Sequence, residues 1–499
     1  MTPAKTKSLD PSWLALVTIV LAVTAVRLFG LSLAQVDLGV DEAQYWLWAQ
    51  DPAWGYYSKP PMVAWLIGAA QSVCGPSEAC IRSPATLAWA GTSLFVGATA
   101  KQMFGPRVGT VAALAALLAS GAIFSARIIS TDAPLLLFWS AALLALVRLR
   151  DGGAMGWAVL LGAAIGLGLL SKYAMLYFSG GLVLAVVFDP ATRQALVSRR
   201  GLVVLGIGLI VLMPNLVWNL GHGLATLRHT ADNASGGGLT PGIVDPLAFA
   251  GSQVFIAGPV VFAGFLWAVW RGIRGQASAD ERLLFLFSVP IFLGLTVVAT
   301  LTRAHANWAA SGLIAAFILG AAVLVRAGRT GWLVAGFALA LAFQALTLWG
   351  DVNADRWVVA GETPYAPVLG WEVFADTIAD RAEVNGTVAV VAERRSEIAA
   401  LAYYARDRAV TAKAWPPASG QPPQNHFQMA RALTGRESGP VLAVSPCAGS
   451  DRFAASYGRV IDLGPVSTPV GPIRQRTVHL FLLDEPRMTL AAPAPCPAR

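Results

Sequence analysis

Two adjacent acids and a lysine in one short stretch have the types and spacing for chemistry on a phosphate. Asp41 and Glu42 are neighbours, and Lys59 follows 17 residues after Glu42, directly ahead of two prolines. Lysine and arginine hold phosphate groups, and a carboxylate can deprotonate an attacking hydroxyl as a general base. Such a set could break the bond between a sugar and a lipid-linked phosphate, because cations stabilise the departing phosphate.

Further ionisable residues lie near the ends of apolar runs that we expect to face this same compartment. Asp132 is a third acid of this set. The other members are Lys59, Arg82, Arg127, Lys172, Arg228 and Arg303, together with His222, His229 and His305. Ionisable groups near a membrane are costly and by default suggest a functional site. Their convergence on one compartment favours a site over scattered structural roles.

Each residue also has an ordinary structural interpretation. Asp41 and Glu42 could cap a helix, since carboxylates favour helix N-termini, and Asp132 could be a helix N-cap. Lys172 could extend its ammonium to the membrane interface, and Arg127 could simply pair with Asp132.

Aromatic residues surround several of the candidates. The stretch 45–57, "YWLWAQDPAWGYY", could form an interfacial aromatic belt. His222 and His229 could likewise be interface residues beside Trp218. The sequence leaves these alternatives open.

The composition predicts a membrane protein. Of 499 residues, 56% are hydrophobic and 13% charged, whereas soluble domains carry about 25% charged residues. Apolar runs of about 20 residues, long enough to cross a bilayer, recur from Trp13 to about Trp349. We therefore expect a polytopic α-helical module over 1–350, whose outer loop 35–81 carries the first motif, and a soluble α/β domain over 351–499.

The basic residues predict the orientation of this module. We expect about eleven spans, at 12–34, 82–104, 107–126, 133–149, 155–171, 173–188, 201–219, 248–270, 283–301, 306–325 and 331–349. Lysines and arginines concentrate in the loops on one side, which is then cytoplasmic. An odd number of spans puts the N-terminus in the cytoplasm and the C-terminal domain outside. The short apolar segment 60–76 is expected as a juxtamembrane helix.

The C-terminal part alternates strand and helix patterns. We expect strands at 387–393, 440–446, 458–464 and 477–485 and a helix at 396–406. Ser396 is a possible N-cap of that helix. The part has no glycine-rich nucleotide motif, so we assign it no nucleotide chemistry.

All four cysteines fall on the expected outer side, where disulfides can form. Cys74 and Cys80 could pair with each other or be two free, small apolar residues. Cys447 and Cys496 lie in the C-terminal domain. No spacing typical of a zinc site is present.

Several segments resemble one family. "DEAQYWLWA…YYSKPPMVAW" resembles the first outer loop of C-type (GT-C) glycosyltransferases, closest to the protein mannosyltransferase-like group that includes the aminoarabinose transferase of lipid A. "RIISTDAPLLLFW" resembles that group's second acidic motif. "GLLSKYAML", "PNLVWNLGHGLATLRH" and "TRAHANWAA" also resemble segments of bacterial members. The resemblance covers most of 12–350.

The resemblance implies roles for individual residues. Asp41 matches the catalytic acid of the first motif, with Glu42 beside it, and Asp132 matches the second acid. Lys59 matches the lysine that contacts the donor phosphate. Further candidates for the donor phosphate are Arg303, Lys172 and Arg127, and candidates for the rest of the substrates are Tyr57, His222, Arg228, His229 and His305. Ser58 stands where the aminoarabinose enzyme has a glutamate of a metal site, so we expect no metal and no other cofactor.

The implied activity is transfer of a sugar from a polyprenyl (undecaprenyl) phosphate to an acceptor, with inversion, at the outer face of a bacterial inner membrane. The C-terminal domain is then periplasmic. Lipid A or lipopolysaccharide core is the first-choice acceptor, and a protein hydroxyl or a cell-wall polymer is the alternative. A pentose, hexose, uronic acid or aminosugar all remain open, and no nucleic-acid partner is expected.

Two other classes compete with the enzyme. A flippase for lipid-linked sugars predicts polar or broken helices at the bilayer midplane. A non-catalytic scaffold leaves the loop acids and Lys59 unexplained. Apolar spans with polar groups gathered at their outer ends favour an enzyme of the membrane interface.

Overall fold

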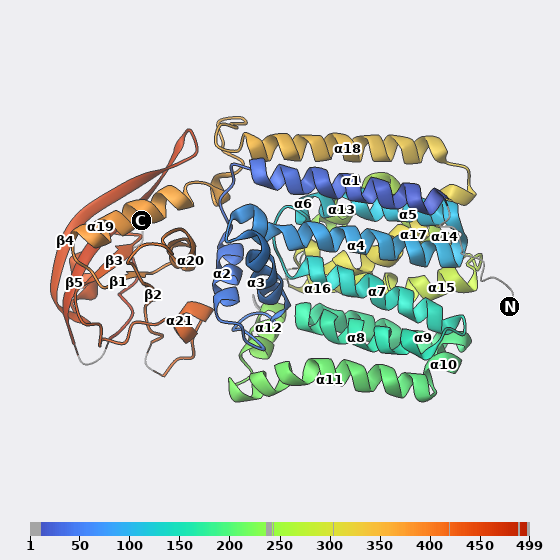
Figure 1. Ribbon diagram of the computed structural model, residues 1–499, viewed down its shortest axis with the longest axis horizontal. Coiled ribbons are helices and arrows are strands. Elements are labelled where there is room, and N and C mark those ends of the chain that lie inside the picture. The colour runs from blue at the N-terminus through green and yellow to red at the C-terminus, as the bar shows by residue number, and fades with distance from the viewer. Residues whose placement is uncertain are drawn as a thin grey trace, which may run out of the picture. The chain divides into compact units, whose positions relative to one another are not determined.

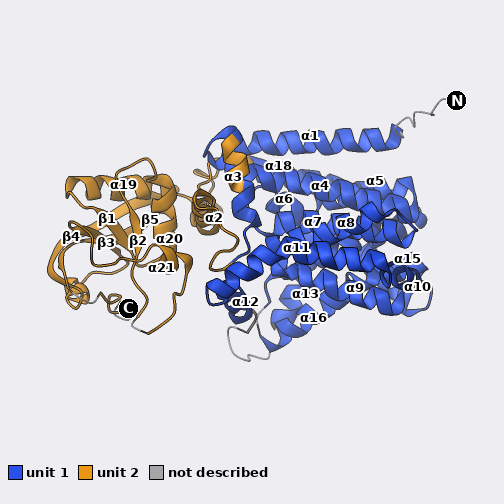
Figure 2. Ribbon diagram, turned by 60° about the horizontal axis from the view of Figure 1, so that its bottom comes forward, with its two compact units in different colours: residues 1–32, 59–66, 73–348 blue, residues 33–58, 67–72, 349–499 orange. Residues whose placement is uncertain are grey.

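The computed structural model describes residues 11–235, 242, 244–302, 304–418, 420–487 and 490–496. The chain forms two compact units (Figure 2). Unit 1 comprises the residues up to Ser32, then 59–66 and 73–348, and unit 2 comprises 33–58, 67–72 and 349–499. The predicted loop 35–81 therefore contributes to both units.

Unit 1 is built of helices (Figure 1). They are α1 (Pro11–Leu33), α4 (Glu78–Phe104), α5 (Pro106–Leu118), α6 (Ser120–Ser125), α7 (Asp132–Arg150), α8 (Met155–Ser171), η1 (Tyr173–Met175), α9 (Leu176–Phe188), α10 (Pro190–Leu196), α11 (Arg199–Gly221), α12 (Ala225–Ser235), α13 (Val244–Ala257), α14 (Pro259–Ile273), α15 (Ala279–Leu286), α16 (Val289–Leu301), η2 (Ala306–Ala309), α17 (Ala310–Arg326) and α18 (Thr330–Val352). Helix α3 (Met62–Cys74) is divided between the two units.

Many of these helices are long and apolar enough to cross a membrane. In the described part of the chain six qualify singly, and up to eight do if each bent pair counts as one span. The chain is therefore a multi-pass membrane protein. A helix is present within every predicted span, and the count of eleven crossings stays a prediction.

The prediction of one straight span at 248–270 is wrong, because this segment forms two helices. Helices α13 and α14 meet at an angle of 115°. Gly258 at the junction has φ +85°, and Pro259 begins α14. Glycine adopts positive φ without strain, and a proline at the first helical position needs no N–H partner. An unbroken apolar pattern hides such a bend, and only the Gly-Pro pair indicates it.

Helices α7 and α17 form the core of unit 1. The most apolar windows of Asp132–Arg150 and Ala306–Arg326 are 78% and 83% buried, against 11% for Arg199–Gly221 and 17% for Thr330–Val352. Close packing is visible where α4 crosses α5, because a Cβ on Gly97 would lie 2.8 Å from the Ala113 Cβ. The helix that begins at Asp132 is thus held on all sides by protein.

Ion pairs fix the C-terminal end of α7. Arg150 donates to Asp189 at 2.9 Å, just ahead of α10, and to Asp280 at 2.6 Å on α15. Glu281, the neighbour of Asp280, accepts from Arg326 at 2.8 Å at the end of α17. Asp189 and Glu281 are buried, and buried charges that are paired and hydrogen-bonded favour a defined geometry. The position of α7 along its own axis, and with it Asp132 at the other end, is therefore fixed.

Unit 2 contains an α/β domain, as predicted. Its elements are α2 (Val40–Gln50), η3 (Ala366–Val368), α19 (Trp371–Val384), β1 (Ala389–Ala392), α20 (Arg395–Tyr404), β2 (Ala412–Ala414), α21 (His426–Ala430), β3 (Val441–Ser445), η4 (Ser450–Phe453), β4 (Tyr457–Val470) and β5 (Arg474–Pro486). The sheet has the order β2-β1-β3-β5-β4. Strands β2, β1 and β3 are parallel, whereas β5 runs antiparallel to both β3 and β4.

The central strands are buried along their whole length, as their all-apolar sequences predict. Trp415, Phe453 and Phe481 fill the core beside β1 and β3. The predicted helix is α20, but its N-cap is Arg394, so the assignment of Ser396 as N-cap is wrong.

Two disulfides are present, Cys74–Cys80 in unit 1 and Cys447–Cys496 in unit 2. The first confirms the predicted pairing. The second ties the C-terminal segment to the end of β3. Arg452 adds to this tie by donating from Nε to the Ala494 carbonyl at 2.7 Å.

Candidate functional site

Unit 1 brings together two of the predicted residues, Asp132 and Lys172. The Lys172 ammonium lies 2.6 Å from Asp132 Oδ1, and Asn307 Nδ2 donates to Asp132 Oδ2 at 2.9 Å. The side chains of Lys172 and Asp132 are 21% and 15% exposed. Each carboxylate oxygen thus has its own donor, from a segment far away in the sequence.

The backbone explains how these side chains meet. Asp132 is the first residue of α7, and the N-cap is Thr131, so Asp132 is not itself the N-cap. Lys172 has extended dihedrals between α8 and η1, which turns its side chain out of the helix. Asn307 lies in η2, which is held by a hydrogen bond of 2.9 Å from Gln253 Nε2 to the Ala306 carbonyl.

Buried amides on α11 support the segment after Lys172. Tyr173 donates its hydroxyl to Asn215 Oδ1 at 2.8 Å, and Asn219 Nδ2 donates to the same hydroxyl at 3.2 Å. Both asparagines are fully buried. Such a network rigidifies the backbone that carries Lys172.

The arrangement suggests what each group can do. Asp132 accepts one hydrogen bond on each oxygen, so it holds Lys172 in a defined orientation. An ammonium has three donors, and only one is directed at Asp132. Lys172 can therefore donate to an anion as well, while Asp132 holds it in position.

Unit 2 holds the two acids of the first motif, and they have different surroundings. Glu42 is buried, and its Oε2 accepts from the Gly39 backbone N–H at 2.9 Å, so it caps α2. Asp41 is 59% exposed and lies 2.8 Å from Arg395 Nη2. The capping interpretation is confirmed for Glu42, while the Asp41 carboxylate is accessible.

Helix α2 packs on α20 of the same unit. The Leu38 N–H donates to the Tyr404 hydroxyl at 2.6 Å, and the rings of Trp46 and Tyr403 meet edge to face at 5.0 Å. Arg395 Nη1 donates to Gln44 at 3.2 Å. The position of Asp41 is therefore set by the C-terminal part of the chain.

The aromatic residues after Asp41 pack inside unit 2. Trp48 stacks on Tyr56 with ring centroids 4.6 Å apart, and both are buried, as is Trp46. His426 lies edge-on to Trp48, and burial lowers its pKa to about 4. For these rings the interpretation as an interfacial belt is wrong, because they form a core that supports the loop.

The phosphate candidates Lys59 and Arg127 and the substrate candidate Tyr57 lie in loops. Tyr57 and Lys59 are half-buried in the loop that precedes α3. The Arg127 guanidinium lies 5.3 Å from the Phe124 ring centroid, and Asp132 takes Lys172 and Asn307 as its partners. Arg303 lies outside the described residues.

The histidine candidates make local contacts. His222 is the C-cap of α11, stacks on Trp218 with ring centroids 4.0 Å apart and contacts the Trp218 carbonyl. His229 meets Asn233 within α12, which also carries the exposed Arg228. His305 lies beside Trp308, next to η2 and thus two residues from Asn307.

Sequence reasoning missed Asn307 and Arg395. Asn307 belongs to a segment already singled out, "TRAHANWAA", but an asparagine carries no charge to draw attention. Arg395 is 354 residues from Asp41, and no local pattern connects them.

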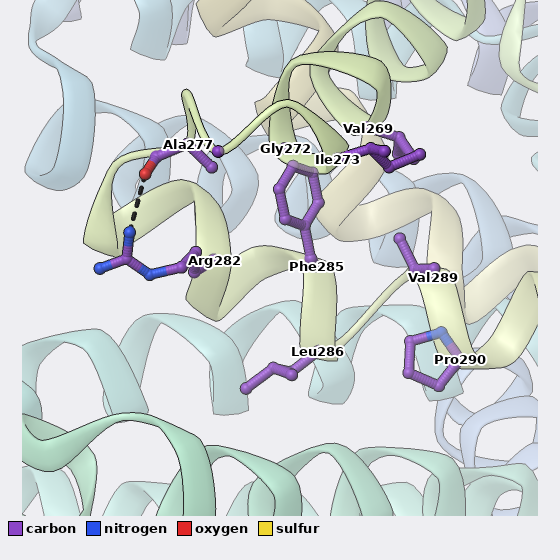
Figure 3. A pocket seen from close by; sticks show the side chains of 10 residues that line it. Val269, Gly272, Ile273, Ala277, Arg282, Phe285, Leu286, Val289 and Pro290 are labelled. Carbon is purple, nitrogen blue, oxygen red and sulfur yellow. Dashed lines mark hydrogen bonds between the residues drawn. The ribbon is translucent and has the colours of Figure 1, made fainter.

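A cavity of about 390 Å³ lies elsewhere in unit 1 (Figure 3). Val269 of α14, Phe285 of α15 and Pro290 of α16 line it, and Arg282 at its edge donates to the Ala277 carbonyl at 2.8 Å. Helix α15 contacts the Arg150 end of α7. Since α7 has 19 residues, this end is roughly 27 Å from Asp132. The cavity is therefore separate from the Asp132–Lys172 pair.

Comparison with known proteins decides the family. The sequence model of the dolichyl-phosphate-mannose-protein mannosyltransferases matches residues 58–218. The lipid A galacturonosyltransferase RgtD of Rhizobium johnstonii is 33% identical over 429 residues, which cover 85% of this chain and 89% of RgtD. The chain belongs to the ArnT-like family of GT-C glycosyltransferases.

Other comparisons agree with this family. The lipopolysaccharide core galacturonosyltransferase RgtA of the same organism is 26% identical over 52% of this chain and 56% of its own. The structure of ArnT from Cupriavidus metallidurans bound to undecaprenyl phosphate has a TM-score of 0.66 at 15% identity, over 93% of this chain and 97% of ArnT. That likeness establishes the GT-C fold, and the predicted fold class is confirmed to this extent.

Proposed function

We propose that this protein transfers a hexuronic acid from undecaprenyl phosphate to lipid A at the outer face of the inner membrane. Galacturonic acid is the first candidate for this sugar. The observation that carries the proposal is the identity of 33% with a lipid A galacturonosyltransferase over 85% of the chain. The ArnT structure bound to undecaprenyl phosphate supports the carrier. Lipopolysaccharide core is the alternative acceptor, because RgtA acts on it.

The proposal assigns the acid–base step to Asp41. Its carboxylate is exposed, and it either takes the proton of the acceptor hydroxyl or orients an acceptor that is already anionic. Glu42 orients the start of α2 through its bond to the Gly39 N–H. Attack from the face opposite the phosphate inverts the anomeric carbon.

The proposal assigns the departing phosphate to basic residues of unit 1. Lys172 is held by Asp132, and its remaining donors stabilise the negative charge that develops on the leaving oxygen. Lys59 precedes Pro60 and Pro61, whose fixed φ limits the movement of the backbone beneath the ammonium. Arg303 and Arg127 are further candidates for this role.

A reaction with purified components tests the function. The protein in detergent is given undecaprenyl phosphate-linked galacturonic acid and lipid A, and the mass of the product is measured by mass spectrometry. We expect lipid A to gain the mass of one hexuronosyl group, and no gain with Asp41→Asn. No product from any polyprenyl-linked sugar would contradict the proposal.

A flippase for the same lipid is the second candidate, because the bend between α13 and α14 is the kind of broken helix that transporters use. The reaction in detergent distinguishes a transferase from a flippase. A transferase forms a covalent product there, whereas a flippase only moves its lipid across a bilayer and forms none.

A further inference from the structure

Two adjacent arginines of unit 2 lie at the start of α20, and one of them reaches the proposed catalytic acid. Arg395 Nη2 is 2.8 Å from Asp41 Oδ1, and Arg395 Nη1 donates to the buried Gln44 at 3.2 Å. The Arg395 side chain remains 40% exposed. Part of its guanidinium edge is therefore accessible to a ligand beside Asp41.

The positive charges of Arg394 and Arg395 are not fully balanced by the carboxylates that pair with them. Arg394 is 58% exposed, and its nearest carboxylate, Glu397, is 3.9 Å away. Burial raises the pKa of Glu397 to about 7, so at neutral pH it carries only part of a negative charge. The start of α20 thus carries two exposed guanidiniums, and Asp41 is an exposed carboxylate that pairs with one of them, so a second anion can bind there.

Guanidinium groups match one kind of anion well. The planar fork of an arginine binds a carboxylate through two parallel hydrogen bonds. The carboxylate of a hexuronic acid is attached to the sugar ring whose anomeric carbon reacts. An arginine in contact with the catalytic acid can therefore reach the carboxylate of the reacting sugar.

We propose that Arg395, with Arg394 beside it, binds the carboxylate of the donor sugar and so selects a hexuronic acid over the neutral sugar. This inference rests on the proposed function. The sugar carboxylate takes the place of Asp41 on Arg395, and Asp41 becomes available to the acceptor. A neutral sugar leaves Asp41 paired, so selection acts on turnover as well as on binding.

Two donors that differ only at this group test the proposal. The full-length protein is given undecaprenyl phosphate-linked galacturonic acid or undecaprenyl phosphate-linked galactose, which has an alcohol in place of the carboxylate. We expect kcat/KM to favour the acidic donor by at least about 100-fold, since a site built for a polar group rejects an analogue that lacks it.

Arg395→Gln should abolish most of that preference, by lowering kcat/KM for the acidic donor and leaving or raising it for the neutral one. Arg395→Lys should restore part of it, because the charge is kept without the fork, and Arg394→Gln should weaken it. Arg459→Gln is the matched control, since Arg459 is an exposed arginine on β4 of the same unit.

An equal loss on both donors with Arg395→Gln would mean that Arg395 only positions Asp41, and would overturn the proposal. An unchanged preference would overturn it too, and both results leave the proposed transfer intact. If the wild type used neither donor, the proposed function itself would fail. Should Arg395→Gln not fold, the Arg395→Lys and Arg394→Gln variants decide by the same ratio.

Discussion

Asp132 and Lys172 form a unit in which one side chain positions the other. Their contact of 2.6 Å is mostly shielded from solvent, and Asn307 donates a hydrogen bond to the second oxygen of the carboxylate. Removing one partner of such a pair leaves the other charge without compensation. The two residues should therefore not act independently in the reaction.

The first prediction is a double-mutant cycle on this pair. Asp132→Asn and Lys172→Met should each lower kcat/KM by about 10- to 100-fold, and the double variant should lose little more than the worse single one, since residues in contact couple by about 0.5–3 kcal/mol. The measurement is initial rate against donor concentration on folded protein.

Asp151→Asn is the matched control for that cycle. It removes an exposed carboxylate that accepts from Gln102 at 2.7 Å just beyond the end of α7, and the rate should be unchanged. Strictly additive losses for Asp132→Asn and Lys172→Met would contradict the assignment of a single unit.

For individual residues, the sequence predicts which charged residues form the site better than it predicts which residues contact them. The acids and lysines of the motifs were found because their charges stand out against apolar runs. Their partners were not, because Asn307 is neutral and Arg395 approaches Asp41 only through the fold of unit 2. The contacts of Asp132 are with Lys172 and Asn307, whereas the sequence suggested Arg127 as its partner.

Among the elements, α20 links the C-terminal part of the chain to the first motif. Its first turn carries Arg395, and its buried Glu397 accepts from the Arg394 N–H at 3.4 Å. Desolvation raises the pKa of Glu397 to about 7, Glu393 acts in the same direction, and Arg394 and Arg476 oppose it. The start of α20 should therefore respond to pH.

The second prediction concerns the stability of unit 2. The folded state binds a proton on Glu397 more tightly than the unfolded state, so this group stabilises the fold below pH 4.5 and loses its contribution as pH rises to about 7. The loss amounts to about 3 kcal/mol. Glu397→Gln should remove this slope.

Thermal unfolding of the full chain at several pH values measures the effect. The stability of the variant relative to the wild type should increase as pH rises from 4.5 to 7 and should not increase further above that range. A difference between the two proteins that is independent of pH would contradict the assigned pKa.

The third prediction concerns the disulfide of unit 2. Cys447 and Cys496 are 49 residues apart, and Cys74 and Cys80 are six apart. In the chain-entropy model, removing the longer link costs about 4 kcal/mol and the shorter about 2 kcal/mol. Cys447→Ser should therefore lower the unfolding temperature more than Cys80→Ser, and equal shifts would count against this account.

Among the helices and strands, the sequence predicts those whose apolar residues form a distinctive pattern. The buried strands β1 and β3 and the helix α20 were expected because all-apolar and amphipathic runs are distinctive. The three-residue β2 was missed because so short a strand has no period. The bend at Gly258 was missed because its flanks are equally apolar.

For the whole molecule, orientation in the membrane is the main open prediction. About eleven crossings put the N-terminus in the cytoplasm and the C-terminal domain in the periplasm, by the positive-inside rule. The presence of Cys74–Cys80 and Cys447–Cys496 agrees, because disulfides form in that oxidising compartment.

Fusions to the C-terminus test this orientation. A phosphatase that folds only in the periplasm should be active there, and a fluorescent protein that folds only in the cytoplasm should stay dark. The reverse pattern would place the C-terminal domain in the cytoplasm and Asp41 with it, because both belong to unit 2, and would contradict the predicted orientation.

The mass of lipid A from cells that lack this protein, complemented with wild type or with Asp41→Asn, tests most directly whether the protein modifies lipid A and whether Asp41 is its catalytic acid. Both proteins must be present at equal levels in the membrane. We predict that wild type restores the mass of one hexuronosyl group and that Asp41→Asn does not. Equal restoration by both would contradict the role of Asp41, and no change of lipid A or core mass in any strain would contradict the proposed acceptor.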